Sequence, residues 1–141
     1  MSNDLIVIVV VEDDPDDQYL IQKALSSVEL DLDIRFIGNG LEAVQFFESS
    51  IAKADVANSL VLLDLNLPGA SGLEVLKSIK SDPEYQPLPV VILTTSEFDA
   101  EKQSAKALGA SDYIVKPDDI NRFKEVLSHV IKAYVKNGET E

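Results

Sequence analysis

The hydrophobic positions of this chain form short apolar runs that alternate with stretches of helical spacing. Five runs have the length of a strand, and several of them contain no polar residue, which is typical of parallel strands buried on both faces. We expect the strands at 5–11, 34–37, 60–65, 88–93 and 113–115.

Between these runs, apolar residues recur every three or four positions, which predicts helices. The first helix is expected to begin at Pro15 and to bury Leu20, Ala24 and Val28. The others are expected around 44–51, at 73–79 behind Ser71 as the N-cap, at 97–108, and from 120 to about 134 ahead of Asn137-Gly138. We interpret Tyr19 and Phe98 as packing residues, 52–58 as a loop and 137–141 as a frayed tail.

Five strand–helix units in strict alternation predict an α/β fold with one doubly wound parallel sheet and helices on both faces. A chain of 141 residues is long enough for one domain with a sizeable core, which we place at about 5–135 within a single domain of 1–141. In such sheets, ligands bind outside the carboxyl ends of the strands. The functional site is expected there.

Composition excludes several classes of function. The formal net charge of -13 disfavours direct binding to nucleic acid or to an anionic membrane. The chain has no cysteine and one histidine, which excludes a zinc–thiolate site and a thiol nucleophile. It has no apolar stretch near the ~20 residues that span a bilayer, and no signal-peptide pattern. We therefore expect a soluble, cytoplasmic protein, and we interpret His129 as a surface residue.

Acidic residues follow the first and third expected strands. The segment 12–17 holds five acids in six residues, and Asp64 follows four apolar residues. Acidic side chains in the first turn of a helix interact favourably with the helix dipole, and we interpret Asp16 and Asp17 in this way. A carboxylate at the edge of a buried sheet is costly unless it is paired or bound to metal, and crowded carboxylates disfavour one another's ionisation. Oxygen ligands without histidine or cysteine suit Mg²⁺, which works beside phosphate groups.

A hydroxyl and an ammonium group end the fourth and fifth expected strands. Leu93-Thr94-Thr95-Ser96 supplies the hydroxyl, and Tyr113-Ile114-Val115-Lys116-Pro117 supplies the cation. Taken singly, a threonine at a strand end is usually a cap, and a lone lysine is usually a solvated surface charge. Opposite a cluster of carboxylates, the two together predict a site for phosphoryl chemistry.

Four motifs of the chain resemble those of response-regulator receiver domains. In order, they are Val11-Glu12-Asp13-Asp14, Leu63-Asp64-Leu65-Asn66-Leu67-Pro68 with Gly72, Leu93-Thr94, and Val115-Lys116-Pro117. The resemblance covers residues 5 to about 135 and implies the flavodoxin-like (CheY-like) fold, with five parallel strands in the order 2-1-3-4-5. It also implies a single-domain response regulator of a two-component phosphorelay. Such a protein accepts a phosphoryl group from a sensor histidine kinase and signals by phosphorylation-controlled protein contacts, and it acts as a phosphoacceptor signalling protein, not as an enzyme.

The resemblance also implies a role for each matching residue. Asp64 becomes the phosphoacceptor, Thr94 and Lys116 contact the phosphoryl group, and Thr94 and Tyr113 form the switch. A cis peptide is expected before Pro117, which an X-Pro bond permits at modest cost. The expected ligands of Mg²⁺ are Asp13, Asp64, the backbone carbonyl of Asn66, and Glu12 through water.

The acidic opening, the Leu-Pro-Gly-Ala-Ser-Gly loop and the Leu-Thr-Thr-Ser strand end look most like stand-alone receivers paired with bacterial phytochrome histidine kinases. That likeness implies a homodimer through the fourth helix (97–108), the fifth strand (113–115) and the fifth helix (from 120). One departure is Asp118, where many members of the family have phenylalanine. The downstream protein partner is not defined by the sequence.

Two alternative functions use the same residue types. A Mg²⁺-dependent phosphohydrolase of the haloacid dehalogenase type also has an aspartyl nucleophile, but it needs a second aspartate two residues later, where this chain has Asn66. A phosphorylation-independent adaptor with this fold has no chemical need for Asp13, Asp64, Thr94 and Lys116. Their presence argues against it.

Overall fold

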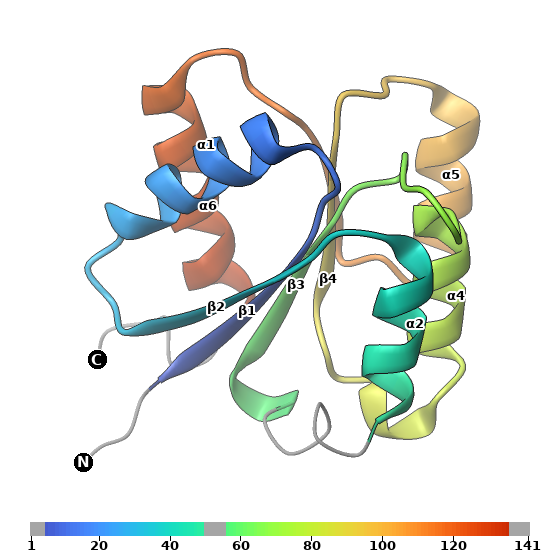
Figure 1. The fold of residues 1–141 in the computed structure, drawn as a ribbon. Coiled ribbons are helices and arrows are strands. Elements are labelled where there is room, and N and C mark those ends of the chain that lie inside the picture. The colour runs from blue at the N-terminus through green and yellow to red at the C-terminus, as the bar shows by residue number, and fades with distance from the viewer. Residues whose placement is uncertain (1–4, 50–55, 136–141) are drawn as a thin grey trace.

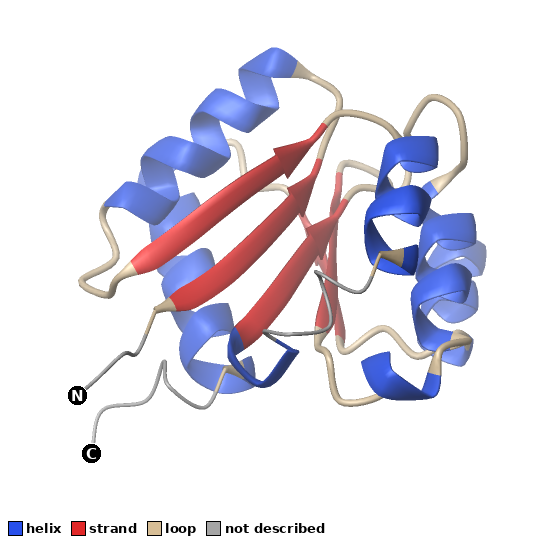
Figure 2. Ribbon diagram, turned by 60° about the horizontal axis from the view of Figure 1, so that its bottom comes forward, coloured by secondary structure: helices blue, strands red, loops and turns tan. Residues whose placement is uncertain are grey.

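The computed structural model describes residues 5–49 and 56–135, and these residues form one five-stranded sheet. The strand order is β2–β1–β3–β4–β5 and every pairing is parallel, so the arrowheads in Figure 2 point towards one end of the molecule. This is the flavodoxin-like order implied by the sequence, and it confirms the predicted fold class. The strands are β1 (Ile6–Val11), β2 (Leu32–Ile37), β3 (Ser59–Leu63), β4 (Val90–Thr94) and β5 (Asp112–Val115).

Helices cover both faces of the sheet, as predicted. Figure 1 shows α1 and α6 on one face and α2, α4 and α5 on the other. Their bounds are α1 (Pro15–Ser26), α2 (Gly40–Glu48), α4 (Gly72–Lys80), α5 (Asp99–Ala107) and α6 (Ile120–Tyr134), with short 3₁₀ turns at η1 (Val56–Asn58) and η2 (Pro83–Tyr85).

The core lies in two layers, because alternate strand side chains point to opposite faces. Val7, Val9 and Val11 pack into the layer under α2, α4 and α5, whereas Ile8 and Val10 pack under α1 and α6. All six residues of β1 are buried. The unbroken apolar run of β1 therefore marks a central strand, and its carboxyl end lies between two helical layers.

Helix starts near the sheet edge follow local sequence rules. Asp14 caps α1 by accepting a hydrogen bond from the Asp16 backbone N–H, and Pro15 occupies the first helical position. Ser71 caps α4 as predicted, and its reciprocal bonds with Glu74 complete a capping box. These caps fix where the loops that follow β1 and β3 pass into helix.

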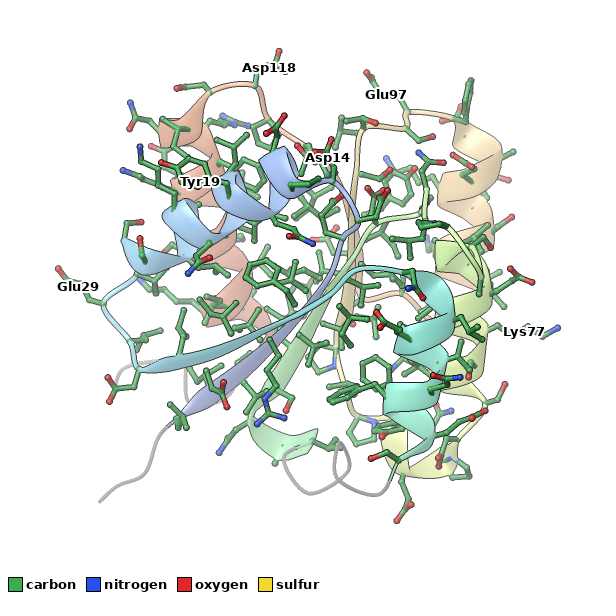
Figure 3. The ribbon with its side chains drawn as sticks, viewed as in Figure 1. Asp14, Tyr19, Glu29, Lys77, Glu97 and Asp118 are labelled. Atoms are coloured by element: carbon green, nitrogen blue, oxygen red, sulfur yellow. The ribbon has the colours of Figure 1, made fainter. Side chains whose placement is uncertain are left out.

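The packing predicted for some apolar residues is wrong. The buried face of α1 carries Ile21, Ala24 and Leu25, whereas Leu20 is exposed because the contact with α6 turns that position outwards. Tyr19 is 63% exposed and points outwards in Figure 3, and Phe98 is 71% exposed. Neither aromatic side chain is a packing residue of this core.

Some sequence predictions concern residues outside the described ranges. The expected loop 52–58 is described only from Val56, where it forms η1. The tail 137–141 lies outside the described residues. Within residues 5–49 and 56–135, no helix is both long and apolar enough to cross a membrane.

Candidate functional site

The carboxyl ends of four strands bring the predicted site residues to one end of the molecule. Glu12 follows β1, Asp64 follows β3, Thr94 ends β4 and Lys116 follows β5. Backbone hydrogen bonds continue past the strand ends: the Asp64 N–H donates to the Val11 carbonyl at 3.1 Å, and the Lys116 N–H donates to the Thr94 carbonyl at 2.8 Å. Figure 3 shows Asp14, Glu97 and Asp118 at the same end.

Three carboxylates form a cluster that fits a hard divalent cation. Glu12, Asp13 and Asp64 each offer one oxygen, and these oxygens lie within 4.8 Å of one another. Glu12 and Asp64 are buried, whereas Asp13 is exposed. The backbone N–H of Asn66 donates to Asp64 Oδ1 at 3.2 Å, which holds the Asn66 backbone beside the cluster. An all-oxygen set of this kind matches the ligands that Mg²⁺ prefers.

Lys116 joins the cluster by an ammonium group with three carboxylate partners. Its Nζ donates to Glu12 Oε1 at 2.7 Å, to Asp17 Oδ2 at 2.7 Å and to Asp64 Oδ2 at 3.1 Å, and its side chain is 6% exposed. Burial on its own favours the neutral amine, but the hydrogen bonds with Asp17 and Glu12 and the charge of Asp64 outweigh it and raise the pKa of Lys116. The lysine is therefore charged at neutral pH.

The charge of Glu12 depends on its surroundings. Burial raises its pKa to about 7, while hydrogen bonds from Lys116 and from the Asp14 backbone N–H, at 3.0 Å, favour the ionised form. The Glu12 backbone carbonyl also accepts a hydrogen bond from the Gln18 side chain at 2.6 Å. A cation bound beside Glu12 would favour its ionised state.

The two predicted switch residues are connected through Ser96. Thr94 is fully buried, and its Oγ1 accepts a hydrogen bond from the Ser96 N–H at 3.3 Å. The Tyr113 hydroxyl donates to the Ser96 carbonyl at 3.0 Å, and burial raises the pKa of this phenol. The Ser96 hydroxyl in turn donates to Glu101 of α5. One loop residue thus contacts the threonine, the tyrosine and the helix that follows.

Two glycines hold the loop that carries Asp64 and Asn66. The N–H of Gly40, at the start of α2, donates to the Pro68 carbonyl, and the N–H of Gly72 donates to the Leu65 carbonyl, both at 2.9 Å. A Cβ at Gly40 would lie 1.7 Å from the Ala70 carbonyl oxygen, and one at Gly72 would lie 2.2 Å from the Asp64 carbonyl oxygen. Only glycine allows this close approach.

The structure changes two parts of the sequence interpretation. The sequence predicts only a helix-dipole role for Asp17, but its carboxylate also binds Lys116, and its position in the first turn of α1 gives no signal of that contact. The expected cis peptide before Pro117 is wrong: the described residues contain no cis peptide bond, so the Lys116–Pro117 bond is trans. The trans form is the lower-energy isomer of an X-Pro bond.

Comparisons with known proteins agree with this geometry. A family model described as the response regulator receiver domain matches residues 8–128. Response regulator Rcp1 of Synechocystis is 36% identical over 119 residues, which cover 82% of this chain and 79% of that protein. A crystal structure of phosphorylated RcpA, a cyanobacterial phytochrome response regulator, gives a TM-score of 0.80 at 32% identity and covers 92% of this chain and 93% of its own. A crystal structure of the Mn²⁺-bound form of Rcp1 gives a TM-score of 0.78 at 30% identity, and the match covers 93% of this chain and 95% of that one.

Proposed function

We propose that this chain, which belongs to the response regulator receiver domain family, is a single-domain response regulator that accepts a phosphoryl group on Asp64. The observation that carries the proposal is the contact of Lys116 with both Glu12 and Asp64, beside a cluster of three carboxylates. A buried cation next to a strand-end carboxylate can stabilise the negative charge of a transferring phosphoryl group.

The proposed reaction is transfer from a phosphohistidine of a sensor histidine kinase. An Asp64 carboxylate oxygen attacks the phosphorus atom, so a phosphorus–oxygen bond forms while the phosphorus–nitrogen bond breaks. The electron pair of the broken bond leaves with the imidazole nitrogen, which then takes a proton. Lys116 lies 3.1 Å from Asp64 Oδ2, so its ammonium group can contact the transferred group.

The residues present fit a Mg²⁺ ion, and we propose the ligands expected from the sequence: Asp13, Asp64 and the backbone carbonyl of Asn66, with Glu12 through water. When bound, the ion supplies positive charge that offsets the charge on the phosphoryl oxygens. The support is the spacing of the Glu12, Asp13 and Asp64 oxygens and the Mn²⁺-bound form of the related Rcp1.

We further propose that phosphorylation changes the face formed by α5, β5 and α6. A phosphoryl group on Asp64 would add acceptor oxygens that draw Thr94, and the Ser96 contacts of Thr94 and Tyr113 would carry that change to α5. This face exposes Val115 and is the proposed homodimer surface. Sedimentation that shows only monomer at tens of micromolar, a range typical of transient complexes, would rule out the homodimer.

The proposed phosphoryl donor is a phytochrome-type histidine kinase in the cytoplasm.

The acceptor role is tested by the intact mass of the protein after incubation with acetyl phosphate, with and without Mg²⁺. We expect one phosphoryl adduct on the wild type that requires Mg²⁺, no adduct on Asp64→Asn, and a normal adduct on Asp118→Asn, which removes an exposed carboxylate at the same end of the molecule. No adduct on folded wild type, with acetyl phosphate or a phosphorylated kinase, would favour the phosphorylation-independent adaptor. An adduct on Asp64→Asn would identify a different nucleophile.

A further inference from the structure

The three carboxylates that bind Lys116 differ in their access to water. The side chains of Glu12 and Asp64 are 2% and 8% exposed, whereas that of Asp17 is 28% exposed. A buried carboxylate that loses its cation stays without water, which is costly. A part-exposed carboxylate regains water when the contact breaks, so its contact with the lysine costs less to lose. Asp17 is therefore the partner that Lys116 releases most easily.

Asp17 is also held in a fixed place beside the site. It lies in the first turn of α1, whose start is capped by Asp14. The next residue, Gln18, donates its side-chain N–H to the Glu12 carbonyl at 2.6 Å and its backbone N–H to the Asp14 carbonyl at 2.9 Å. These bonds join the first turn of α1 to the end of β1, so Asp17 lies close to the site to which Glu12 belongs.

We propose that Asp17 is a positioning residue, and that Lys116 exchanges its contact with Asp17 for one with the phosphoryl group on Asp64. The inference rests on the proposed function. An ammonium group has three N–H donors, and Glu12, Asp17 and Asp64 accept all three. Phosphorylation removes the charge of the Asp64 carboxylate, so the N–H that it now accepts passes to a phosphoryl oxygen. The other phosphoryl oxygens are also strong acceptors and compete for a second N–H of Lys116, and the bond that gives way to them is the one to part-exposed Asp17. Phosphorylation thereby releases the first turn of α1 from the lysine.

The test measures the binding of beryllium fluoride, a reversible phosphoryl mimic on carboxylates, in the presence of Mg²⁺. In Asp17→Asn the lysine loses a charged competitor, so we expect half-saturation at a concentration about two- to fivefold lower than in the wild type, the range for a part-exposed ion pair. Asp16→Asn is the matched control, because it removes the same charge from the same helical turn at an exposed position. Thermal unfolding verifies that each variant is folded.

A second readout follows the contact itself. In ¹⁵N-labelled wild type, beryllium fluoride should shift the backbone amide signals of Asp17 and Gln18, and in Asp17→Asn these shifts should shrink while those at the site remain. If wild type and Asp17→Asn bind beryllium fluoride with equal affinity, the inference is overturned. It is also overturned if Asp16→Asn raises that affinity as much as Asp17→Asn does. Both outcomes leave the acceptor role of Asp64 intact. A wild type that neither binds beryllium fluoride nor forms the phosphoryl adduct would overturn both.

Discussion

The ammonium nitrogen of Lys116 lies 2.7 Å from a carboxylate oxygen of Glu12, although 104 positions separate the two residues in the chain. Both side chains are almost fully buried. The pair joins the end of the inner strand β1 to the end of the edge strand β5. The buried carboxylates of Glu12 and Asp64 share Lys116 as a cationic partner.

Replacement of that cation should destabilise the metal-free protein. Lys116→Met leaves Glu12 and Asp64 buried without a positive partner, and we expect the free energy of unfolding to fall by about 3 kcal/mol. Lys77→Met is the control, because Lys77 points outwards from α4 (Figure 3) and should change stability by less than about 0.5 kcal/mol. Urea unfolding at neutral pH measures both. Similar losses in the two variants would mean that the cluster does not depend on Lys116.

The raised pKa of Glu12 predicts how stability depends on pH without metal. In the unfolded chain Glu12 titrates near its ordinary value of 4.5, whereas in the folded protein its pKa is about 7. Between these values the folded state holds more protons, so this residue lowers the free energy of unfolding as pH rises from 4.5 to 7. Glu12→Gln should lack that contribution. Urea titrations of both proteins across this range measure it, and parallel pH profiles would contradict the assignment.

A methyl group at Gly72 should disturb the acceptor loop. In Gly72→Ala the new Cβ would meet the Asp64 carbonyl oxygen at 2.2 Å, so the backbone of Asp64 must move, at a cost of about 1–3 kcal/mol. The adduct formed with acetyl phosphate should also fall, because the carboxylate moves with its backbone. Gly38→Ala is the control, since a Cβ there has no heavy atom within 4 Å. If both variants unfold and react like wild type, the loop is not held by this contact.

The hydroxyl of Tyr113 should order the loop between β4 and α5. Tyr113→Phe removes the donor to the Ser96 carbonyl, with an expected loss of about 1 kcal/mol and shifted amide signals at Ser96, Glu97 and Phe98. Tyr134→Phe removes a hydroxyl that donates to the Ser111 carbonyl at 3.2 Å. This control should leave those three amide signals in place. If these three amide signals do not move in Tyr113→Phe, Ser96 does not connect Tyr113 to the loop.

The sequence predicted the fold class because burial on both faces leaves a plain signal. The apolar run of β1 and the alternation of strands with amphipathic helices were enough to infer the parallel sheet, and the order of the strands came from the family resemblance. Boundaries were less accurate, since pairing extends strands past polar residues. β2 begins at Leu32, two positions early, because Leu32 and Asp33 pair with Ile6 and Val7 of β1. Asp33 is satisfied there by Arg35 at 2.9 Å.

The sequence predicts those site residues whose chemistry is unusual for their position in the fold. A carboxylate directly after a buried strand, as at Asp64, stands out in the sequence. Asp17 does not, because an acid in the first turn of a helix has an ordinary explanation, and its contact with Lys116 depends on where α1 and β5 meet in space. The exposure of Leu20 also depends on tertiary packing, since the contact with α6 determines which side of α1 is buried.

The distance in sequence between Lys116 and its partners has a consequence for synthesis. A nascent chain leaves the ribosome with its N-terminus first, so Glu12, Asp17 and Asp64 are available well before Lys116 and the strand β5 that precedes it. Until that strand emerges, the carboxylates must remain hydrated or recruit cations from solution. Closure of the acidic end therefore waits until Lys116 has been synthesised, and a ribosome stalled before Lys116 would present the acids without this lysine.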